Sequence, residues 1–169
     1  GVASLSITFE DISSNAGVTQ TTVTDSSEVT IDLTAPTLPV VEIVSSNDAD
    51  TTRANEGDTI TLTITASEAI TLPAVQIAGQ YAAVSGADDS WSATYTVVGA
   101  DVIEGAASVL IVYEDLASNE GTTETTMTDG SAVEIDLTVP TLPTVSITSD
   151  NSNDVTKVNH GDTITLTFT

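Results

Sequence analysis

The sequence predicts an all-β fold, an antiparallel β-sandwich of about seven strands that is repeated in tandem. Three observations lead to this prediction. Val, Ile, Leu and Thr are abundant, and hydrophobic residues make up 40 % of the 169 residues, too many for a disordered acidic tail. β-Branched residues favour pleated strands, whereas Lys, Arg, Gln and Met, which favour helices, are scarce. Strand-like segments also follow one another at intervals of about 8–15 residues between Gly and Asn, which is typical of a sandwich.

Seven strands are expected in one complete unit. They are predicted at residues 40–45, 58–67, 74–79, 81–86, 90–98, 107–115 and 131–137. The second of them alternates Ile and Leu with Thr, the period of two that marks a half-buried strand. We expect the third and fourth strands to pair. The fifth strand places Trp91, Ala93, Tyr95 and Val97 on one face, which should lie at the centre of the core.

An internal repeat divides the chain. "IDLTAPTLP" at residues 31–39 returns as "IDLTVPTLP" at 135–143, and residues 1–65 match 105–169 without a gap at about 60 % identity. A period of 104 residues is the size of a small sandwich domain rather than of a solenoid repeat. Pro36 and Pro39 restrict the backbone between two strand-like segments. The expected units are the end of one repeat at 1–36, a complete repeat at 37–139 and the start of another at 140–169.

The charge of the chain excludes several functions. It carries 25 acidic and two basic residues, for a net charge of -23, so it offers no basic patch for nucleic acid or for an anionic membrane. No apolar run is long enough to insert into a membrane, and no signal peptide opens the sequence. A compact body this acidic repels itself unless salt screens it or divalent cations bind. The absence of cysteine is compatible with a bacterial exterior.

Two motifs carry a resemblance to a known family. "EDLASNEG" (114–121) and "VEIDLTVPTLP" (133–143) resemble the turn and the terminal segment of bacterial immunoglobulin-like repeats, the extender regions of giant repeats-in-toxin biofilm and ice-binding adhesins. The sequence has "SNEG" and "SNAG" where that family often has A-G-N. The resemblance implies an immunoglobulin-like fold, a bacterial cell-surface location, neighbouring repeats as partners, and calcium ions at the domain junctions that stiffen a long stalk.

Acidic and amide side chains near both linkers could supply the calcium ligands. Calcium binds six to eight oxygens from carboxylates, amides, carbonyls and water. The candidates near the first linker are Glu10, Asp11, Asn15, Asp32, Asn47, Asp48 and Asp50. The candidates near the second linker are Glu114, Asp115, Asn119, Asp136, Asn151 and Asp154. We expect the turn after the sixth strand and the end of the seventh to lie at the same pole of the sandwich. If the acidic loop of the next repeat faces that pole, three segments from two repeats converge around one cation.

Simpler interpretations of these residues stay open. Acidic loops are usually solvated, and Asn15 and Asn119 could adopt the left-handed turn conformation that asparagine tolerates. Asp58 and Asp162, in "GDTITL", are expected to shape the turn that enters a strand rather than to bind metal.

No motif predicts an enzyme. The single histidine, His160, occupies the position of Glu56 in the preceding repeat, so an imidazole is not part of the repeated design. Arg53 and Lys157 are expected to pair with nearby carboxylates. The leading hypothesis is a structural spacer of an adhesin. The alternatives are a module that binds surface glycans or a partner through its loops, and a repeating subunit of a surface layer or filament in which neighbouring chains complete the terminal segments.

Overall fold

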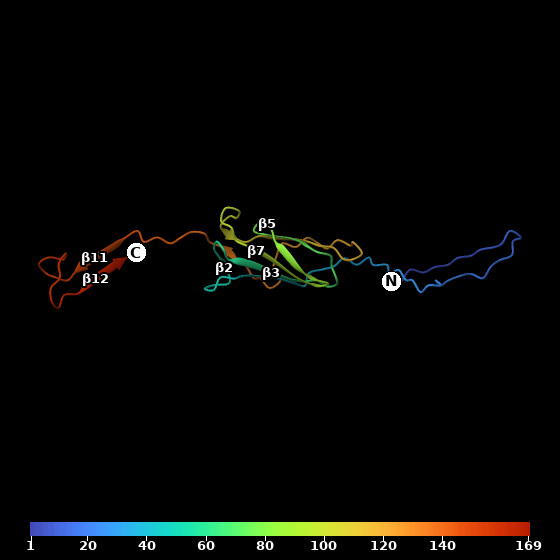
Figure 1. Ribbon diagram of the computed structural model, residues 1–169, viewed down its shortest axis with the longest axis horizontal. Helices are drawn as coiled ribbons and strands as arrows, with labels where there is room; N and C mark the ends of the chain where they lie inside the picture. Colours follow the sequence, from blue (N-terminus) through green and yellow to red (C-terminus); the bar gives the residue numbers. More distant parts are fainter. The chain divides into compact units, whose positions relative to one another are not determined.

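The computed structural model describes residues 1–169 and contains no helix (Figure 1). The prediction of an all-β fold is therefore confirmed, and the several antiparallel sheets are consistent with a β-sandwich. The chain divides into two compact units, Gly1–Asp136 and Leu137–Thr169. No helix long and apolar enough to cross a membrane is present. The immunoglobulin-like topology and the boundaries at residues 36 and 139 stay predictions.

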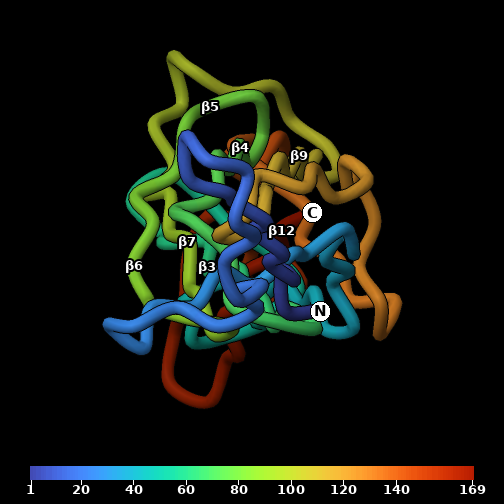
Figure 2. The backbone as a smooth tube through the Cα atoms, turned by 90° about the vertical axis from the view of Figure 1, so that its right-hand side faces the viewer, coloured from blue at the N-terminus to red at the C-terminus, as the bar shows by residue number.

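Twelve strands form four sheets. The strands are β1 (Val40–Ser45), β2 (Arg53–Ala54), β3 (Thr59–Thr65), β4 (Ala74–Ile77), β5 (Gln80–Tyr81), β6 (Ala83–Ala87), β7 (Ser90–Thr96), β8 (Gly105–Ala106), β9 (Val109–Val112), β10 (Glu134–Ile135), β11 (Val145–Ser149) and β12 (Ile164–Phe168). The sheets have the orders β1-β3-β7-β6, β5-β4-β9, β2-β10-β8 and β11-β12. Only the pair of β10 and β2 is parallel. In Figure 2, β3, β6 and β7 of one sheet lie apart from β4 and β9 of another.

The core lies in residues 37–136, which we call the central domain. Ile60, Leu62 and Ile64 of β3 are buried, while the threonines between them are at least partly exposed, as the period of two predicts. Other strands contribute the remaining large aliphatic side chains. They are Val41 and Ile43 of β1, Val75 and Ile77 of β4, Ile111 of β9 and Ile135 of β10.

The expected centre of the core at β7 is only half correct. Ala93 and Val97 are buried, but Trp91 and Tyr95 are only partly buried. Trp91 pairs with Gly86 near one end of β7, and its indole Nε1 donates a hydrogen bond to the carbonyl oxygen of Asp88 at 3.2 Å. The indole therefore covers the end of the sheet, and the aliphatic residues of β3 occupy the centre.

The expected pairing of the third and fourth strands is also wrong in part. β4 pairs with β5 and β9, whereas β6 lies beside β7 in the other sheet. Ala78 and Gly79 have positive φ angles of 52° and 78° and form the tight turn that reverses the chain into β5. The chain passes from one sheet to the other at Ala82. The Ala82 N–H still donates to the carbonyl of Val75 in β4, at 3.0 Å, and the next residue begins β6.

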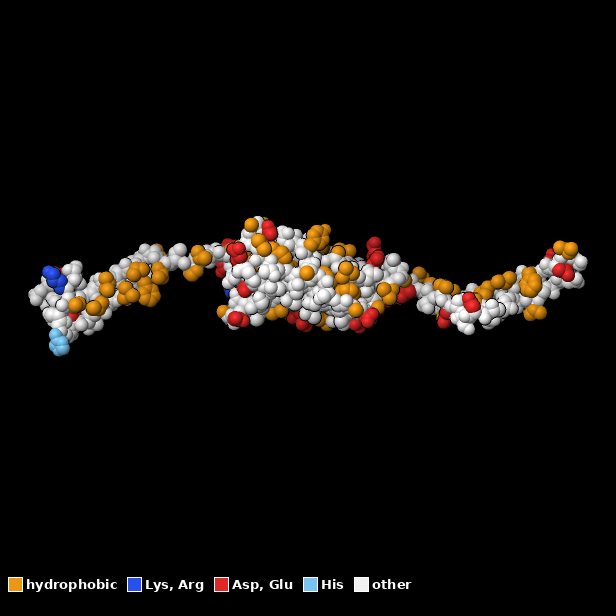
Figure 3. Space-filling view, in the orientation of Figure 1, with side chains coloured by type: hydrophobic (Ala, Val, Ile, Leu, Met, Phe, Trp, Pro, Cys, Tyr) orange, Lys and Arg blue, Asp and Glu red, His pale blue; other side chains and the backbone are white.

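The segments that precede and follow the central domain in the sequence are hairpins. Residues 1–36, the N-terminal segment, form an irregular hairpin through the pairs Val2–Thr30, Ile7–Gln20 and Glu10–Ala16. Residues 137–169 hold β11 and β12, paired from Val145–Phe168 to Ser149–Ile164. Apolar side chains are exposed along both segments (Figure 3).

Candidate metal centre

The turn that follows β9 is organised by one carboxylate. Asp115 Oδ1 accepts hydrogen bonds from the backbone N–H groups of Ala117 (2.7 Å) and Asn119 (2.8 Å), and Oδ2 accepts one from Asn119 Nδ2 (2.8 Å). The Asn119 side-chain hydrogen bond, together with the backbone donors, lowers the pKa of Asp115 although burial opposes the shift. The left-handed residue is Ser118, with φ of 64°, so the proposed left-handed role of asparagine is wrong. Asn119 serves as a donor instead.

The N-terminal segment contains the same turn 104 residues earlier. Asp11 Oδ1 accepts from the N–H groups of Ser13 (2.8 Å) and Asn15 (2.9 Å), and Oδ2 accepts from Asn15 Nδ2 (2.8 Å). Ser14 has the positive φ of 64°. The hydrogen bond from the Asn15 side chain is the main cause that lowers the pKa of Asp11. Each turn thus uses its carboxylate as an internal acceptor.

Three carboxylates meet where the N-terminal segment enters the central domain. Oxygens of Asp32, Glu68 and Asp115 all lie within 4.8 Å of one another, and we call this group the junction cluster. Asp32 precedes Pro36, whereas Glu68 follows β3 and Asp115 follows β9. Asp115 is buried and the other two are half-buried. The cluster therefore combines a residue before the proline linker with two residues beyond it.

Backbone contacts hold these three segments together. Asn119 Nδ2 also donates to the Asp32 carbonyl oxygen at 3.2 Å, which ties the turn to the incoming chain. Thr37 and Ser67 exchange two hydrogen bonds, from Ser67 N–H to the Thr37 carbonyl at 2.9 Å and from Thr37 N–H to Ser67 Oγ at 3.0 Å. Thr71 N–H donates to the Glu114 carbonyl at 2.9 Å. Glu68 is therefore fixed between the linker and the turn.

The junction cluster has the composition of a hard-cation site. Asp32 Oδ1 accepts one hydrogen bond, from Thr34 N–H at 3.0 Å, and Asp115 Oδ2 accepts one, so both carboxylates keep lone pairs for a cation. A cavity of about 260 Å³ adjoins them and is lined by all three carboxylates. The two basic residues of the chain form their ion pairs elsewhere. Oxygen ligands of this kind suit calcium, and water can complete the coordination.

The expected arrangement of the poles is wrong. The turn at 114–119 lies against Asp32 and the linker that enters the domain, not beside the end of the last strand. That end lies near β2, because the Asp136 N–H donates to the Ala54 carbonyl at 2.9 Å. After the turn the chain runs back along β1, where the N–H groups of Val41 and Ile43 donate to Thr128 Oγ1 and Ser131 Oγ, each at 2.9 Å.

The other carboxylates predicted as ligands are not among the three that form the junction cluster. Asp11 and Asn15 lie in the turn of the N-terminal hairpin, at the end away from the paired Thr30. Glu10 and Glu114 occupy ladder positions beside these turns, paired with Ala16 and Glu120. The acidic loop at 46–52 lies beside β10, since Glu134 N–H donates to the Thr52 carbonyl at 2.9 Å.

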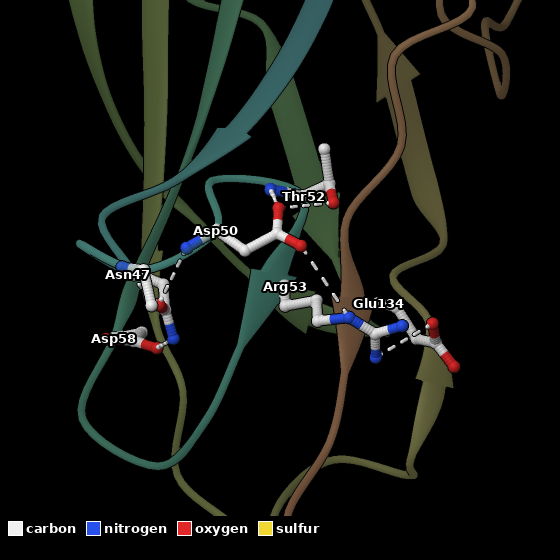
Figure 4. Close-up of polar contacts among 7 residues, drawn as sticks. Asn47, Asp50, Thr52, Arg53, Asp58 and Glu134 are labelled. Atoms are coloured by element: carbon white, nitrogen blue, oxygen red, sulfur yellow. Dashed lines mark hydrogen bonds and ion pairs between the residues drawn. The ribbon is translucent and has the colours of Figure 1, made fainter.

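The acidic loop after β1 is a hydrogen-bonded network of its own (Figure 4). Asn47 Oδ1 accepts from the N–H groups of Ala49 (3.0 Å) and Asp50 (3.2 Å), and its Nδ2 donates to Asp58 Oδ2 at 3.0 Å. Asp50 Oδ1 accepts from Thr52 N–H (2.9 Å) and Oγ1 (2.6 Å), and the Thr52 hydroxyl is the main cause that lowers the pKa of Asp50. Asp48 is exposed in this loop.

Arg53 and Lys157 pair with nearby carboxylates, as expected. Arg53 Nη1 lies 3.3 Å from Glu134 Oε2, and Arg53 Nε lies 3.8 Å from Asp50 Oδ2. Lys157 Nζ lies 2.9 Å from Asp154 Oδ2 in the C-terminal hairpin.

The C-terminal hairpin repeats the network of the acidic loop. Asn151 Nδ2 donates to Asp162 Oδ2 at 3.1 Å, and Asp154 Oδ1 accepts from Thr156 Oγ1 at 2.6 Å. Asp162 Oδ2 also accepts from Asn159 N–H at 2.7 Å, as Asp58 Oδ2 does from Asn55 N–H at 2.8 Å. The expected turn-forming role of both aspartates is confirmed. The recurrence of Asn47 and Asp50 one period later thus has a structural cause that needs no metal.

Glu68 was missed by the sequence analysis for a definite reason. The predicted ligands lie in the acidic segments assigned to the two proline linkers, whereas Glu68 follows β3, well beyond Pro39. The one available signal was an acidic residue directly after the apolar alternation of β3, at the same end of the domain as the linker.

Comparisons with known proteins give no match: no family model, no curated protein and no solved structure matches the chain. The resemblance of the motifs at 114–121 and 133–143 to adhesin repeats stays a prediction. The junction cluster is the feature of the structure from which a function can be argued.

Proposed function

We propose that this chain is a structural spacer of a large extracellular bacterial adhesin, in which calcium at the junctions between repeats stiffens a stalk that projects an adhesive tip from the cell surface. The observation that carries the proposal is the junction cluster, because Asp32 comes from one side of Pro36 and Glu68 and Asp115 come from the other. A cation bound by all three would fix the orientation of two consecutive repeats.

The stiffening follows from electrostatics. Three carboxylates within 4.8 Å of one another repel, and the repulsion favours separation of Asp32 from the central domain. A bound divalent cation supplies the positive charge that reverses this repulsion. The contribution of the chain is to hold the oxygens in place: the turn donors fix Asp115, and Asn119 anchors the Asp32 backbone.

The tandem sequence supports a junction at each repeat. Asp136 occupies the position of Asp32 one period later, in the same "IDLT" context before a proline. Asp11 and Asp115 likewise share one turn geometry. A net charge of -23 also makes bound cations favourable, since they reduce the repulsion along an array of such units.

Calorimetric titration of the whole chain with Ca²⁺ tests the proposal. We expect binding at the junction cluster, and Glu68→Gln should weaken it by about tenfold or more, because a charged ligand is lost. Glu42→Gln is the matched control, since Glu42 is exposed on β1 and lies outside the cluster. Equal affinities of the two variants would exclude calcium binding at this junction.

Small-angle scattering of the same proteins tests the mechanical part. Calcium should narrow the distribution of distances between the N-terminal segment and the central domain, and a chelator should broaden it. Glu68→Gln should show the broad distance distribution of the chelated protein at every calcium concentration below the dissociation constant of the variant. A distribution that is identical with calcium and with chelator would rule out the stiffening role even if calcium binds.

A further inference from the structure

The outward face of the sheet formed by β5, β4 and β9 contains a groove. Alternate residues along β9 and its continuation point to opposite faces of the sheet. Ile111 and Tyr113 are buried, so Val112 and Glu114 face outward. The groove has a volume of about 300 Å³, and we call it the sheet groove. Its lining includes Leu72, Ala74, Val112, Glu114 and Glu120, all within the central domain.

The floor of the sheet groove is apolar and open to solvent. Leu72 is 67 % exposed and Val112 is 49 % exposed. Ala74 of β4 lies directly opposite Val112 in the ladder, so the two side chains share the outward face. Exposed apolar surface of this kind gains free energy when an apolar group of another molecule covers it.

Two carboxylates accompany this apolar floor. Glu114 and Glu120 lie opposite each other in an antiparallel bridge. Side chains at such positions have Cβ atoms about 5 Å apart, and like charges there destabilise the pairing of the two strands. No Lys or Arg of the chain offsets this repulsion, because Arg53 and Lys157 form their ion pairs with other carboxylates.

The corresponding residues of the N-terminal segment are different. Thr8 stands 104 positions before Val112. Ala16 stands 104 positions before Glu120 and holds the same ladder position beside its turn. The same turn geometry therefore forms with a polar residue at the first position and without a second carboxylate at the other. The apolar floor and the paired charges are features of the central domain that its turn does not require.

We propose that the sheet groove binds a basic peptide segment of a partner protein, in which an apolar residue neighbours an arginine or a lysine. The apolar side chain and the aliphatic stem of the basic residue cover Leu72 and Val112. The cationic head lies between Glu114 and Glu120, where it removes their repulsion. Arginine fits best, because its planar guanidinium carries five donors and can bind two carboxylates at once.

Charge complementarity selects this occupant over others. A second copy of the chain carries a net charge of -23 and only two basic residues, so it is repelled from the groove. The proposal does not depend on calcium, since no residue of the junction cluster lines the sheet groove. Chelator can therefore be present in the binding tests, and their failure would leave the spacer function untouched.

NMR titration of the whole chain with acetyl-Leu-Arg-Leu-amide provides the first test. With chelator and at low salt, the backbone shifts should be confined to residues that line the sheet groove. Acetyl-Leu-citrulline-Leu-amide has the same shape without the charge, and it should bind about tenfold more weakly or less. Shifts spread over exposed carboxylates throughout the chain, or equal affinities of the two peptides, would overturn the proposal.

Three variants separate the groove from the overall charge. Val112→Thr introduces the residue found at the matching position of the N-terminal segment, and Glu120→Gln removes one of the paired charges. Each should weaken binding of the arginine peptide by about three- to tenfold. Glu42→Gln is the matched control, because it removes one charge from the exposed face of β1 in the other sheet. Equal losses in Glu42→Gln and Glu120→Gln would show that the peptide responds only to net charge, against the proposal.

Thermal unfolding distinguishes a binding role of Glu120 from a structural one. Glu120→Gln relieves the repulsion from Glu114, so it should raise Tm while it weakens peptide binding. A residue that only supports the fold would lower both. A fall in Tm would remove the repulsion on which the proposal rests.

Calcium is the competing occupant for the two glutamates, and a final titration tests it. The arginine peptide is titrated with Ca²⁺ in place of chelator, at an ionic strength matched with KCl. Its affinity should change by less than about twofold, because the carboxylates of the junction cluster lie outside the groove. A loss of about tenfold would assign Glu114 and Glu120 to a metal ion and contradict peptide binding.

Discussion

The central domain and the two hairpins that flank it in the sequence contain matching segments, about 60 % identical, in two environments. Asp11 and Asp115 organise the same turn, and Asn47 and Asn151 bind the same partners. The apolar residues differ: they are buried in the central domain and exposed in the hairpins. Turn geometry is thus determined by a few neighbouring residues, whereas burial needs strands that lie far away in the sequence.

The ladders of β3 and β12 show the difference most clearly. β1 pairs with β3 as β11 pairs with β12, in the same register. Nevertheless, Leu62 is 0 % exposed and its counterpart Leu166 is 57 % exposed. Leu62 lies in a sheet that continues from β3 into β7, whereas β12 pairs with β11 alone. Backbone pairing needs one neighbour, but a core needs a second layer.

Truncation of these two leucines should give the largest difference in unfolding free energy between the central domain and a hairpin. Leu62→Ala should lower the free energy of unfolding of the central domain by about 2–5 kcal/mol, because it removes a buried side chain and leaves a cavity. Leu166→Ala should change it by less than about 0.5 kcal/mol. Urea unfolding followed by Trp91 fluorescence measures both. Equal effects would show that the hairpin is packed as tightly as the domain.

The glycines beneath the two aromatic rings should give the next largest contrast. A Cβ at Gly121 would collide with the Tyr113 ring, and a Cβ at Gly17 would collide with the Phe9 ring. Tyr113 is buried and cannot move, so Gly121→Ala should cost about 1–3 kcal/mol of unfolding free energy. Phe9 is exposed and can rotate into solvent, so Gly17→Ala should leave thermal unfolding unchanged. Calorimetry of both variants checks the difference.

The sequence alone was sufficient for the features that depend on local chemistry. Alternation of Ile and Leu with Thr located β3, and the Gly-rich punctuation located most other strands. The turn role of Asp58 was also predicted correctly, because its carboxylate binds N–H groups only a few residues away. Local patterns suffice where the interacting atoms are close in the chain.

Long-range geometry could not be predicted in the same way. The position of β6 beside β7 depends on a change of sheet at Ala82 that no periodicity signals. The junction cluster joins residues 32, 68 and 115, and only the path of the chain after β9 brings them together. The expectation of ligands near the linkers included Asp32 and Asp115, but it also included loop residues whose hydrogen bonds lie within their own loop.

The asparagines of the two turns should differ in how much they contribute to the unfolding free energy, and this difference should depend on pH. We expect it to be smaller than the difference between the glycine variants. The hydrogen bond from Asn119 lowers the pKa of Asp115 in the folded state, so this carboxylate stabilises the fold above the unfolded pKa of about 4. That stability is lost as the pH falls through the folded pKa. Asn119→Ala should raise the pKa of Asp115 and destabilise the domain near neutral pH, and the difference from wild type should shrink in acid.

Asn15→Ala is the matched control for this pH effect. It removes the same donor from Asp11 and should raise the pKa of Asp11 in the same direction. The turn of the N-terminal hairpin has no buried apolar neighbours, so the unfolding of the central domain should not change. Carboxyl titration by NMR together with urea unfolding at several pH values distinguishes the two results. A destabilisation by Asn15→Ala would mean that the hairpin unfolds together with the domain.

Removal of the ion pairs should give the smallest difference in unfolding free energy between the central domain and a hairpin. Arg53 lies between Asp50 and Glu134, but its side chain is 52 % exposed, and water and salt screen both pairs. Arg53→Met should therefore cost less than about 1 kcal/mol of unfolding free energy at low salt and almost nothing at high salt. Lys157→Met removes a shorter but more exposed pair in the hairpin and should have no measurable effect. If the cost of Arg53→Met persisted at high salt, packing of its aliphatic stem against β10, rather than its charge, would hold β2 in place.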